Sequence, residues 1–302
     1  MPRRRRARAA PSLADLANGY LERHARPNKR PKSVRGDEAM LEQHILPALG
    51  SQRVNAIDRR ANEMLHLSFE DRPYQGNRVL ALLSKMFNLA SAWGWRSDNP
   101  VKGVPKFHEQ RRERWLSDTE LASLAAAIDA HRNQRAADAV RLQLLTGARI
   151  GEVLLSKKAD FDLARGVWTK PSHQTKQKRT EHLPLSAQAI ALVSSIRERS
   201  DPKSEYLIQG EKAGRPLTNL KRFWREVLGQ AGIENYRLHD NRHTYASHLV
   251  SSGMSLEVVG RLLGHTNAST TQRYAHLADN PLREAANGFA DKLEQLGKRS
   301  SP

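Results

Sequence analysis

Residues 97–115 interrupt a chain whose flanking stretches both follow a helical pattern. The interruption begins with a cluster of turn-forming residues at Asp98, Asn99, Pro100, Gly103 and Pro105. It continues into the charged run HEQRRERW, which has little to pack against a core. A domain usually has roughly 100–200 residues, so the stretches 11–96 and 116–296 of this chain of 302 residues can each bury a core. We therefore predict two domains joined by a linker at 97–115.

The N-terminal stretch predicts a small helical bundle. Ser12 and Asp15 have the spacing of a capping box, in which each side chain binds the backbone N–H of the other residue. Apolar residues then recur at helical spacing at Val79, Leu80, Leu82, Leu83, Met86, Phe87 and Ala90. Ahead of the bundle, residues 1–10 read MPRRRRARAA. We expect a disordered basic tail there that contacts phosphates without sequence preference.

The second stretch predicts mainly helix with a small antiparallel sheet, an α+β fold. Ser117 and Glu120 form another capping box ahead of an apolar periodic run. Between Gly166 and Leu185, two short β-rich segments flank the polar connection PSHQTKQK, which indicates a pair of strands. Further helices are expected at 186–199, 219–231, 239–252, 256–263, 269–276 and 281–296, with stops at Gly253 and Gly264 and a tail at 297–302.

Composition narrows the class of partner. The chain has 50 Lys and Arg against 32 Asp and Glu, a formal charge of +18, which favours a polyanion such as nucleic acid over an anionic membrane. The absence of cysteine excludes disulfides, thiolate zinc sites and a cysteine nucleophile. No stretch approaches the roughly 18 consecutive apolar residues of a membrane span, and the first residues contain no apolar segment that could serve as a secretory signal. We expect a soluble, cytoplasmic and nucleoid-associated protein.

Three motifs carry side chains suited to phosphate chemistry. In TGARIGE, Arg149 and Glu152 stand three residues apart, so a helix would place the carboxylate where it can orient the guanidinium. In LHDNRHT, His239 and Arg242 repeat that spacing, and two arginine forks can clamp one phosphate. In LLGHTNASTTQRYAH, a histidine follows a glycine stop and Tyr274 follows nine residues later. Tyr274 is the best candidate for a covalent nucleophile.

The order of these groups resembles the signature of the tyrosine recombinase (phage integrase) family over residues 115–290. The resemblance matches Arg149 and Arg242 to the two phosphate-binding arginines and Tyr274 to the nucleophile. It matches the remaining positions to the turn lysine, the paired histidines and the supporting acid, which here are Lys176, His239, His265 and Glu152. Lys170 and Lys178 lie near Lys176 and compete for the lysine role. One departure is Asn241, where the family usually carries leucine.

The resemblance implies a reaction and an assembly. Arginines and a histidine would stabilise charge on the phosphate, and a base such as His239 would help to deprotonate Tyr274. Lys176 would protonate the leaving 5′ oxygen, giving a 3′-phosphotyrosyl intermediate without metal, ATP or another cofactor. The N-terminal domain would bind the core site of double-stranded DNA. Four protomers would act on two duplexes to integrate or excise a mobile element. An accessory DNA-bending protein is a further possible partner. The helix at 281–296 would dock either on its own protomer or on a neighbouring one.

Other functions use parts of the same pattern. A type IB topoisomerase would use related groups on one duplex, although the compact spacing favours a recombinase. The run MSLEVVGRLLGHTNASTTQRY fits a helix-turn-helix regulator without chemistry, but that interpretation leaves Arg149 and Lys176 unexplained. The histidines also suggest a metal site, because His239 and His243 stand one helical turn apart, but no convincing carboxylate accompanies them.

Overall fold

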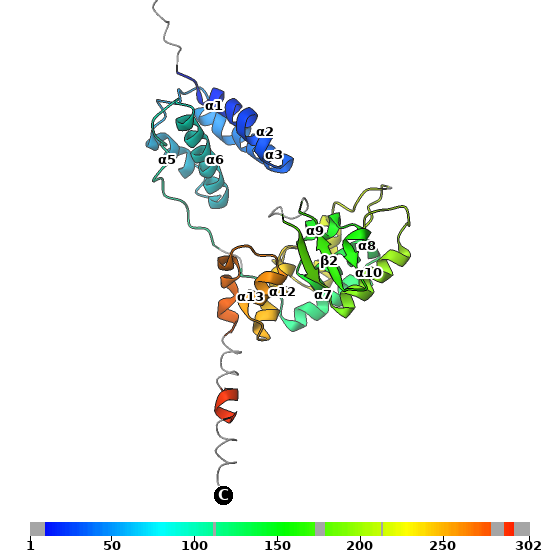
Figure 1. Ribbon diagram of the computed structural model, residues 1–302. Coiled ribbons are helices and arrows are strands. Elements are labelled where there is room, and N and C mark those ends of the chain that lie inside the picture. Colours follow the sequence, from blue (N-terminus) through cyan, green and yellow to red (C-terminus); the bar gives the residue numbers. More distant parts are fainter. Residues whose placement is uncertain (1–9, 111–112, 173–178, 213, 279–286, 293–302) are drawn as a thin grey trace, which may run out of the picture. The chain divides into compact units, whose positions relative to one another are not determined.

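The computed structural model describes residues 10–110, 113–172, 179–212, 214–278 and 287–292. The chain divides into two compact units, Met1–Arg111 and Arg112–Pro302 (Figure 1). Most of the basic tail lies outside the described residues, as do Lys176 and Lys178. Among the described residues, no helix is both long and apolar enough to cross a membrane.

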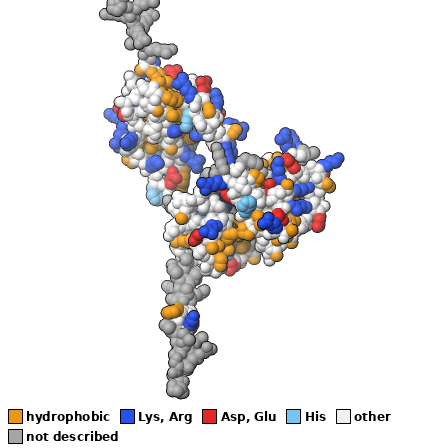
Figure 2. Space-filling view, viewed as in Figure 1, with side chains coloured by type: hydrophobic (Ala, Val, Ile, Leu, Met, Phe, Trp, Pro, Cys, Tyr) orange, Lys and Arg blue, Asp and Glu red, His pale blue; other side chains and the backbone are white. Residues whose placement is uncertain are grey.

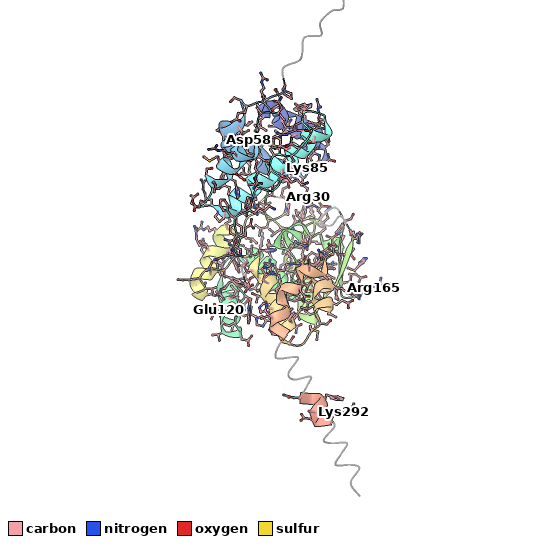
Figure 3. The ribbon with its side chains drawn as sticks, turned by 90° about the vertical axis from the view of Figure 1, so that its left-hand side faces the viewer. Arg30, Asp58, Lys85, Glu120, Arg165 and Lys292 are labelled. Atoms are coloured by element: carbon pink, nitrogen blue, oxygen red, sulfur yellow. The ribbon has the colours of Figure 1, made fainter. Side chains whose placement is uncertain are left out.

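Helices build the N-terminal unit. The predicted capping box is confirmed: the Asp15 backbone N–H donates to the Ser12 hydroxyl at 3.1 Å, and the Ser12 backbone N–H donates to the Asp15 carboxylate at 2.8 Å. Asp58 caps a later helix by accepting from the backbone N–H of Ala61 at 2.8 Å (Figure 3). The helices are α1 (Leu13–Tyr20), α2 (Arg26–Asn28), α3 (Pro31–Met40), α4 (Leu46–Leu49), α5 (Arg59–Leu67) and α6 (Pro73–Ala92), with π-helical segments at Leu21–Ala25 and Leu41–Ile45.

The apolar face of α6 supplies much of the core of this unit. All seven positions that the sequence pattern selected, from Val79 to Ala90, are buried, which confirms the predicted periodicity. They pack with buried side chains of the earlier helices, including Leu16, Tyr20 and Ile45. Burying one such large apolar side chain contributes about 1.5–3 kcal/mol, so this face holds the bundle together.

The C-terminal unit places helices around a small sheet. Its helices are α7 (Asp118–Ala130), α8 (Gln134–Thr146), α9 (Ile150–Leu155), α10 (Ala187–Arg199), α11 (Lys221–Ala231), α12 (Asp240–Ser251) and α13 (Leu256–Leu262). The sheet is antiparallel in the order β1 (Phe161–Asp162), β2 (Val167–Lys170) and β3 (Glu181–Pro184), with Trp168 opposite Phe161 and Leu183. The predicted strand pair is confirmed. β1 was not predicted, because two residues are too few to show an alternating pattern.

The segment after α13 differs from the prediction. A helix was expected at 269–276, but the chain forms 3₁₀ turns at Ala268–Thr270 (η4) and Gln272–Ala278 (η5). Hydroxyl and amide side chains compete with the helical backbone here, since the Ser269 N–H donates to the Asn267 side chain at 2.9 Å. The glycine stops are confirmed, with φ of +90° at Gly253 and +63° at Gly264. The helix expected at 281–296 lies largely outside the described residues, although 287–292 is helical and exposed.

Candidate active site

Arg149 stands at the start of α9, directly after a sharp reversal of the chain. Gly147 ends α8 with φ of +62°, and a Cβ there would lie 2.4 Å from the ring of Tyr245, so both the backbone and the space require glycine. Arg149 then pairs with the Glu152 carboxylate at 2.7 Å, as their spacing predicts. Burial alone would raise the pKa of Glu152, but Lys170 and Arg149 hold it below the usual value. The carboxylate therefore stays charged and orients Arg149.

Arg242 lies on α12, which packs against α8 and α13 (Figure 1). Its side chain is buried, and its guanidinium donates to the backbone carbonyls of Gly147, at 2.9 Å, and Leu263. Each carbonyl precedes a candidate site residue by two positions: Gly147 precedes Arg149, and Leu263 precedes His265. Burial, followed by the nearby charge of Arg149, lowers the pKa of Arg242 to about 10, so the group is still a cation at neutral pH.

The two histidines of the signature lie near these arginines. His265 follows Gly264, and its Nδ1 lies 2.8 Å from the hydroxyl of buried Thr271. Burial, together with the charges of Arg242 and Arg149, lowers the pKa of His265 to about 4. His239 caps α12 and is exposed, while partial desolvation and the charge of Arg242 lower its pKa. Both imidazoles are therefore largely neutral at pH 7 and can donate a ring N–H to an anion.

The lysines separate into one buried residue and two outside the described part of the chain. Lys170 ends β2 with its side chain only 2% exposed, and its ammonium lies 3.2 Å from the Glu152 carboxylate and 2.8 Å from that of Glu181. The ammonium of Lys170 is therefore held between two carboxylates in the interior of the unit. Lys176 and Lys178 fall in the segment between β2 and β3, outside the described residues, so their roles remain predictions.

Tyr274 lies in η5 and is an almost fully buried part of a small hydrophobic core. The residue is 5% exposed, and it packs with Ala246, Val250 and Leu263. Its hydroxyl lies 2.5 Å from Nδ1 of His243, one turn along α12 from His239. Burial raises the pKa of the phenol, and the charges of Arg273 and Arg242 oppose that rise. The histidine at the tyrosine oxygen is therefore His243, and not His239 as the sequence interpretation expected.

The unusual Asn241 has a specific partner. Its side chain is fully buried and donates to the Gln143 side chain of α8 at 3.0 Å. Gln143 in turn donates to the backbone carbonyl of Leu238 at 3.0 Å, just ahead of His239. A polar contact between α8 and α12 therefore occupies the position where the family usually has leucine, and the two helices still pack together.

The structure thus gathers Arg149, Glu152, Arg242, His239, His265 and Tyr274 in one region of the C-terminal unit. Sequence reasoning missed two supporting residues, Glu181 and Thr271, and gave His243 only a place in a possible metal site. No feature of the sequence indicates that Glu181 pairs with Lys170 or that Thr271 contacts His265. His243 could have been found, because it directly follows Arg242 and so lies on the same helical turn. Among the described residues, no group of three or more metal-ligating side chains is placed to hold an ion.

This arrangement suits an oxyanion. Two guanidinium groups and two neutral imidazoles can donate to a bound phosphate, and fixed donors stabilise the charge that develops on its oxygens during attack. A phenol with a histidine ring nitrogen at hydrogen-bond distance is a potential nucleophile. The site can therefore support the attack of Tyr274 on a phosphodiester.

Comparison with known proteins agrees with this chemistry. Residues 114–281 match the model of the phage integrase family, and residues 12–61 match its N-terminal SAM-like domain. The integrase of Escherichia phage 186 is 29% identical over 78% of this chain, and the match spans 64% of that relative. A tyrosine recombinase of Thermosipho africanus is 28% identical over 67% of this chain and 71% of its own length. The chain thus covers slightly less than two thirds of the phage 186 integrase.

Solved structures share the fold. A lambda integrase dimer bound to a COC′ core site superposes with a TM-score of 0.73 at 18% identity, over 86% of this chain and 97% of that one. The Tn1549 transposon integrase with a circular intermediate DNA gives a TM-score of 0.75 at 15% identity, over 87% and 94% of the two chains. Because the family model covers more than half of the sequence, the chain belongs to the phage integrase family of tyrosine recombinases.

Proposed function

We propose that this enzyme cuts and rejoins DNA at specific sites through a 3′-phosphotyrosyl bond to Tyr274. The observation that carries the proposal is the position of the Tyr274 hydroxyl, which meets a histidine nitrogen at 2.5 Å beside the cluster of arginines. Burial raises the pKa of this phenol, and the charges of Arg273 and Arg242 oppose that rise, so the nucleophile lies within the field of a phosphate-binding arginine.

The cations and imidazoles would bind the phosphate and its transition state. Arg149 and Arg242 clamp the non-bridging oxygens, and His239 and His265 donate to them. Preorganised donors of this kind typically contribute about 10²–10³-fold each to the rate. The buried Glu152 and Thr271 fix the orientation of Arg149 and His265 in advance. We assign protonation of the leaving 5′ oxygen to Lys176, on the strength of its place in the signature alone.

The partner is double-stranded DNA. The charge of +18 favours a polyanion, and Lys and Arg side chains are scattered over the visible face of each unit in Figure 2. We propose that residues 11–96 form a domain that binds the core site, that 97–115 link it to a catalytic domain at 116–296, and that the enzyme is cytoplasmic and associated with the nucleoid.

A tetramer is the proposed working assembly. A lambda integrase tetramer bound to a Holliday junction shares the fold at a TM-score of 0.72 and 19% identity. Four protomers on two duplexes would let each 5′ hydroxyl attack a phosphotyrosine on a partner strand, which conserves bond energy without ATP. Because a phage integrase is among the relatives and a transposon integrase shares the fold, we propose integration or excision of a mobile element, with an accessory DNA-bending protein as a further partner.

The test is capture of the covalent intermediate. Duplexes drawn from the DNA that flanks the coding region, each carrying a nick beside the cut site so that the 5′ product is lost, are incubated with the protein in EDTA. The unsubstituted chain should form a denaturation-resistant adduct, whereas Tyr274→Phe should bind the same DNA without forming one, because only the attacking oxygen is lost. An adduct in Tyr274→Phe would overturn the assignment of the nucleophile. Binding without any adduct in the unsubstituted chain would favour a helix-turn-helix regulator instead.

A further inference from the structure

We propose that His243, rather than His239, is the catalytic residue that accepts the proton of Tyr274 during attack on DNA. This inference deepens the proposed function and rests on it. It assigns a role to a histidine that lies outside the set of signature residues matched above.

The geometry supplies the contact that proton transfer needs. The Tyr274 hydroxyl lies 2.5 Å from Nδ1 of His243, within the reach expected of a general base. The two ring centroids are 6.0 Å apart with the planes at 47°. His239 is the neighbouring imidazole, one turn away, and its ring meets that of His243 edge-on at 5.5 Å. His239 is exposed, so its imidazole is available to the phosphate instead.

The burial of Tyr274 explains why its proton needs an acceptor such as His243. Tyr274 is 5% exposed, so few water molecules can reach its hydroxyl and solvent is a poor proton acceptor. Burial raises the pKa of the phenol, which keeps it protonated until a phosphate arrives. An enclosed phenol that has to lose its proton needs an acceptor inside the enclosure, and His243 is the nitrogen base in contact with it.

The surroundings of His243 keep its ring neutral. The charged and titratable groups that face it are His239, Asp240 and Arg242 from α12, Arg273 and His276 from η5, and Glu113 from the segment before α7. Burial, followed by the charges of Arg273 and His239, lowers the pKa of His243 to about 4, so the ring is neutral at pH 7. A bound phosphate would offset the cations and increase the basicity of His243 at the moment of attack.

In the proposed step, one bond to phosphorus forms as another breaks. The Tyr274 oxygen forms a bond to phosphorus while its proton passes to Nδ1 of His243, which becomes an imidazolium. The bond from phosphorus to the 5′ oxygen breaks, and that oxygen takes a proton from the general acid. When a 5′ hydroxyl later attacks the phosphotyrosine, its proton returns to the general acid and the imidazolium of His243 protonates the departing phenolate. No other reactant is consumed.

The experiment separates proton acceptance from positioning. His243→Gln keeps an amide oxygen that can accept a hydrogen bond from Tyr274 but cannot take up its proton. We expect its single-turnover cleavage of the nicked duplex to fall by at least about 100-fold, the usual contribution of a general base, with DNA affinity unchanged. Replacing Tyr274 with a fluorinated tyrosine, whose phenol is more acidic, should restore much of that rate. The same replacement should not rescue Arg149→Ala, which lacks charge stabilisation on the phosphate.

The outcomes distinguish a general base at His243 from a residue that only positions Tyr274. Cleavage by His243→Gln at the unsubstituted rate, or a slow rate without rescue by the fluorinated tyrosine, would overturn the assignment and leave His243 as a positioning residue. Selective rescue of His239→Ala by the fluorinated tyrosine would return the role to His239. Thermal melting of each variant, with His243→Asn as a second amide variant, checks that the fold survives. A failure of the proposed function would look different, because the unsubstituted chain itself would then form no adduct.

Discussion

Replacing Lys170 with methionine should destabilise the C-terminal unit. The substitution keeps a linear side chain and removes the ammonium, which leaves two carboxylates facing the same buried space. The Lys170 ammonium lies 3.2 Å from Glu152 and 2.8 Å from Glu181, and the three side chains are 2%, 5% and 17% exposed. Breaking a buried ion pair by removing one partner costs about 3–5 kcal/mol, because the remaining charge has lost both its partner and its water.

The structure places the expected cost near the lower end of that range. Glu152 keeps its contact with Arg149, and Glu181 can regain some hydration because part of it is exposed. We therefore expect a loss of about 3 kcal/mol. For a unit of this size each kcal/mol corresponds to about 2–4 °C in Tm, so the melting transition should fall by about 6–12 °C. Calorimetry of the full chain measures this shift directly.

The matched control is Lys157→Met. Lys157 pairs with Glu205 at 2.9 Å, a comparable distance, but both side chains are well exposed. Water screens such a pair, so the Tm of this variant should stay close to that of the unsubstituted chain. Equal shifts for the two variants, or an unchanged Tm in Lys170→Met, would refute the argument that burial makes the Lys170 cluster important.

Lowering the pH should reduce the stabilisation that the ion pairs of Glu152 provide. Lys170 and Arg149 hold the pKa of Glu152 below its usual value, so the stability from this carboxylate is present above the unfolded pKa, about 4.3, and is lost as the pH falls through the folded pKa. The difference in stability between Lys170→Met and the unsubstituted chain should therefore narrow below about pH 4.3. A difference that widened on acidification would contradict the ion-pair interpretation.

Two more substitutions test the supports of the site. Asn241→Leu restores the residue usual in the family but strands the buried amide oxygen of Gln143, so it should cost about 1–3 kcal/mol by chemical denaturation, and adding Gln143→Met should recover part of this loss. Thr271→Val removes the hydroxyl at Nδ1 of His265, so cleavage should slow by about tenfold, equivalent to about 1.4 kcal/mol in the barrier, with DNA affinity unchanged. An unchanged denaturation midpoint in the first case, or an unchanged cleavage rate in the second, would contradict these roles.

The elements that the sequence predicted well are those that local chemistry determines. The capping box at Ser12 depends on atoms three residues apart, and the stop at Gly264 depends on one backbone conformation. The buried face of α6 follows from helical periodicity within a single segment. By contrast, β1 has only two residues and exists because it pairs with β2, so its own pattern was too short to reveal it.

In the candidate site, too, contacts between distant parts of the chain could not be predicted from local sequence patterns. The signature named Tyr274 and the arginines, but it could not say which histidine meets the phenol. His239 and His243 both lie near the start of α12. Which of them contacts the phenol depends on how η5 packs beside that helix, and Tyr274 lies 31 residues along the chain from His243. Lys170 was similarly ambiguous, because only the fold shows that its ammonium ends between Glu152 and Glu181.

The role of Arg242 connects the three sequence motifs physically. Its guanidinium joins the carbonyl of Gly147, in the first motif, to the carbonyl of Leu263, in the third, while its own backbone belongs to the second. Arg149 lies two residues after Gly147, and His265 lies two residues after Leu263, so this buried cation helps to hold the backbone that carries both groups. A lysine could not bridge both carbonyls with the same planar geometry, since its ammonium is a single point of charge. The three motifs therefore meet at the side chain of Arg242, which binds the backbone of the first and the third.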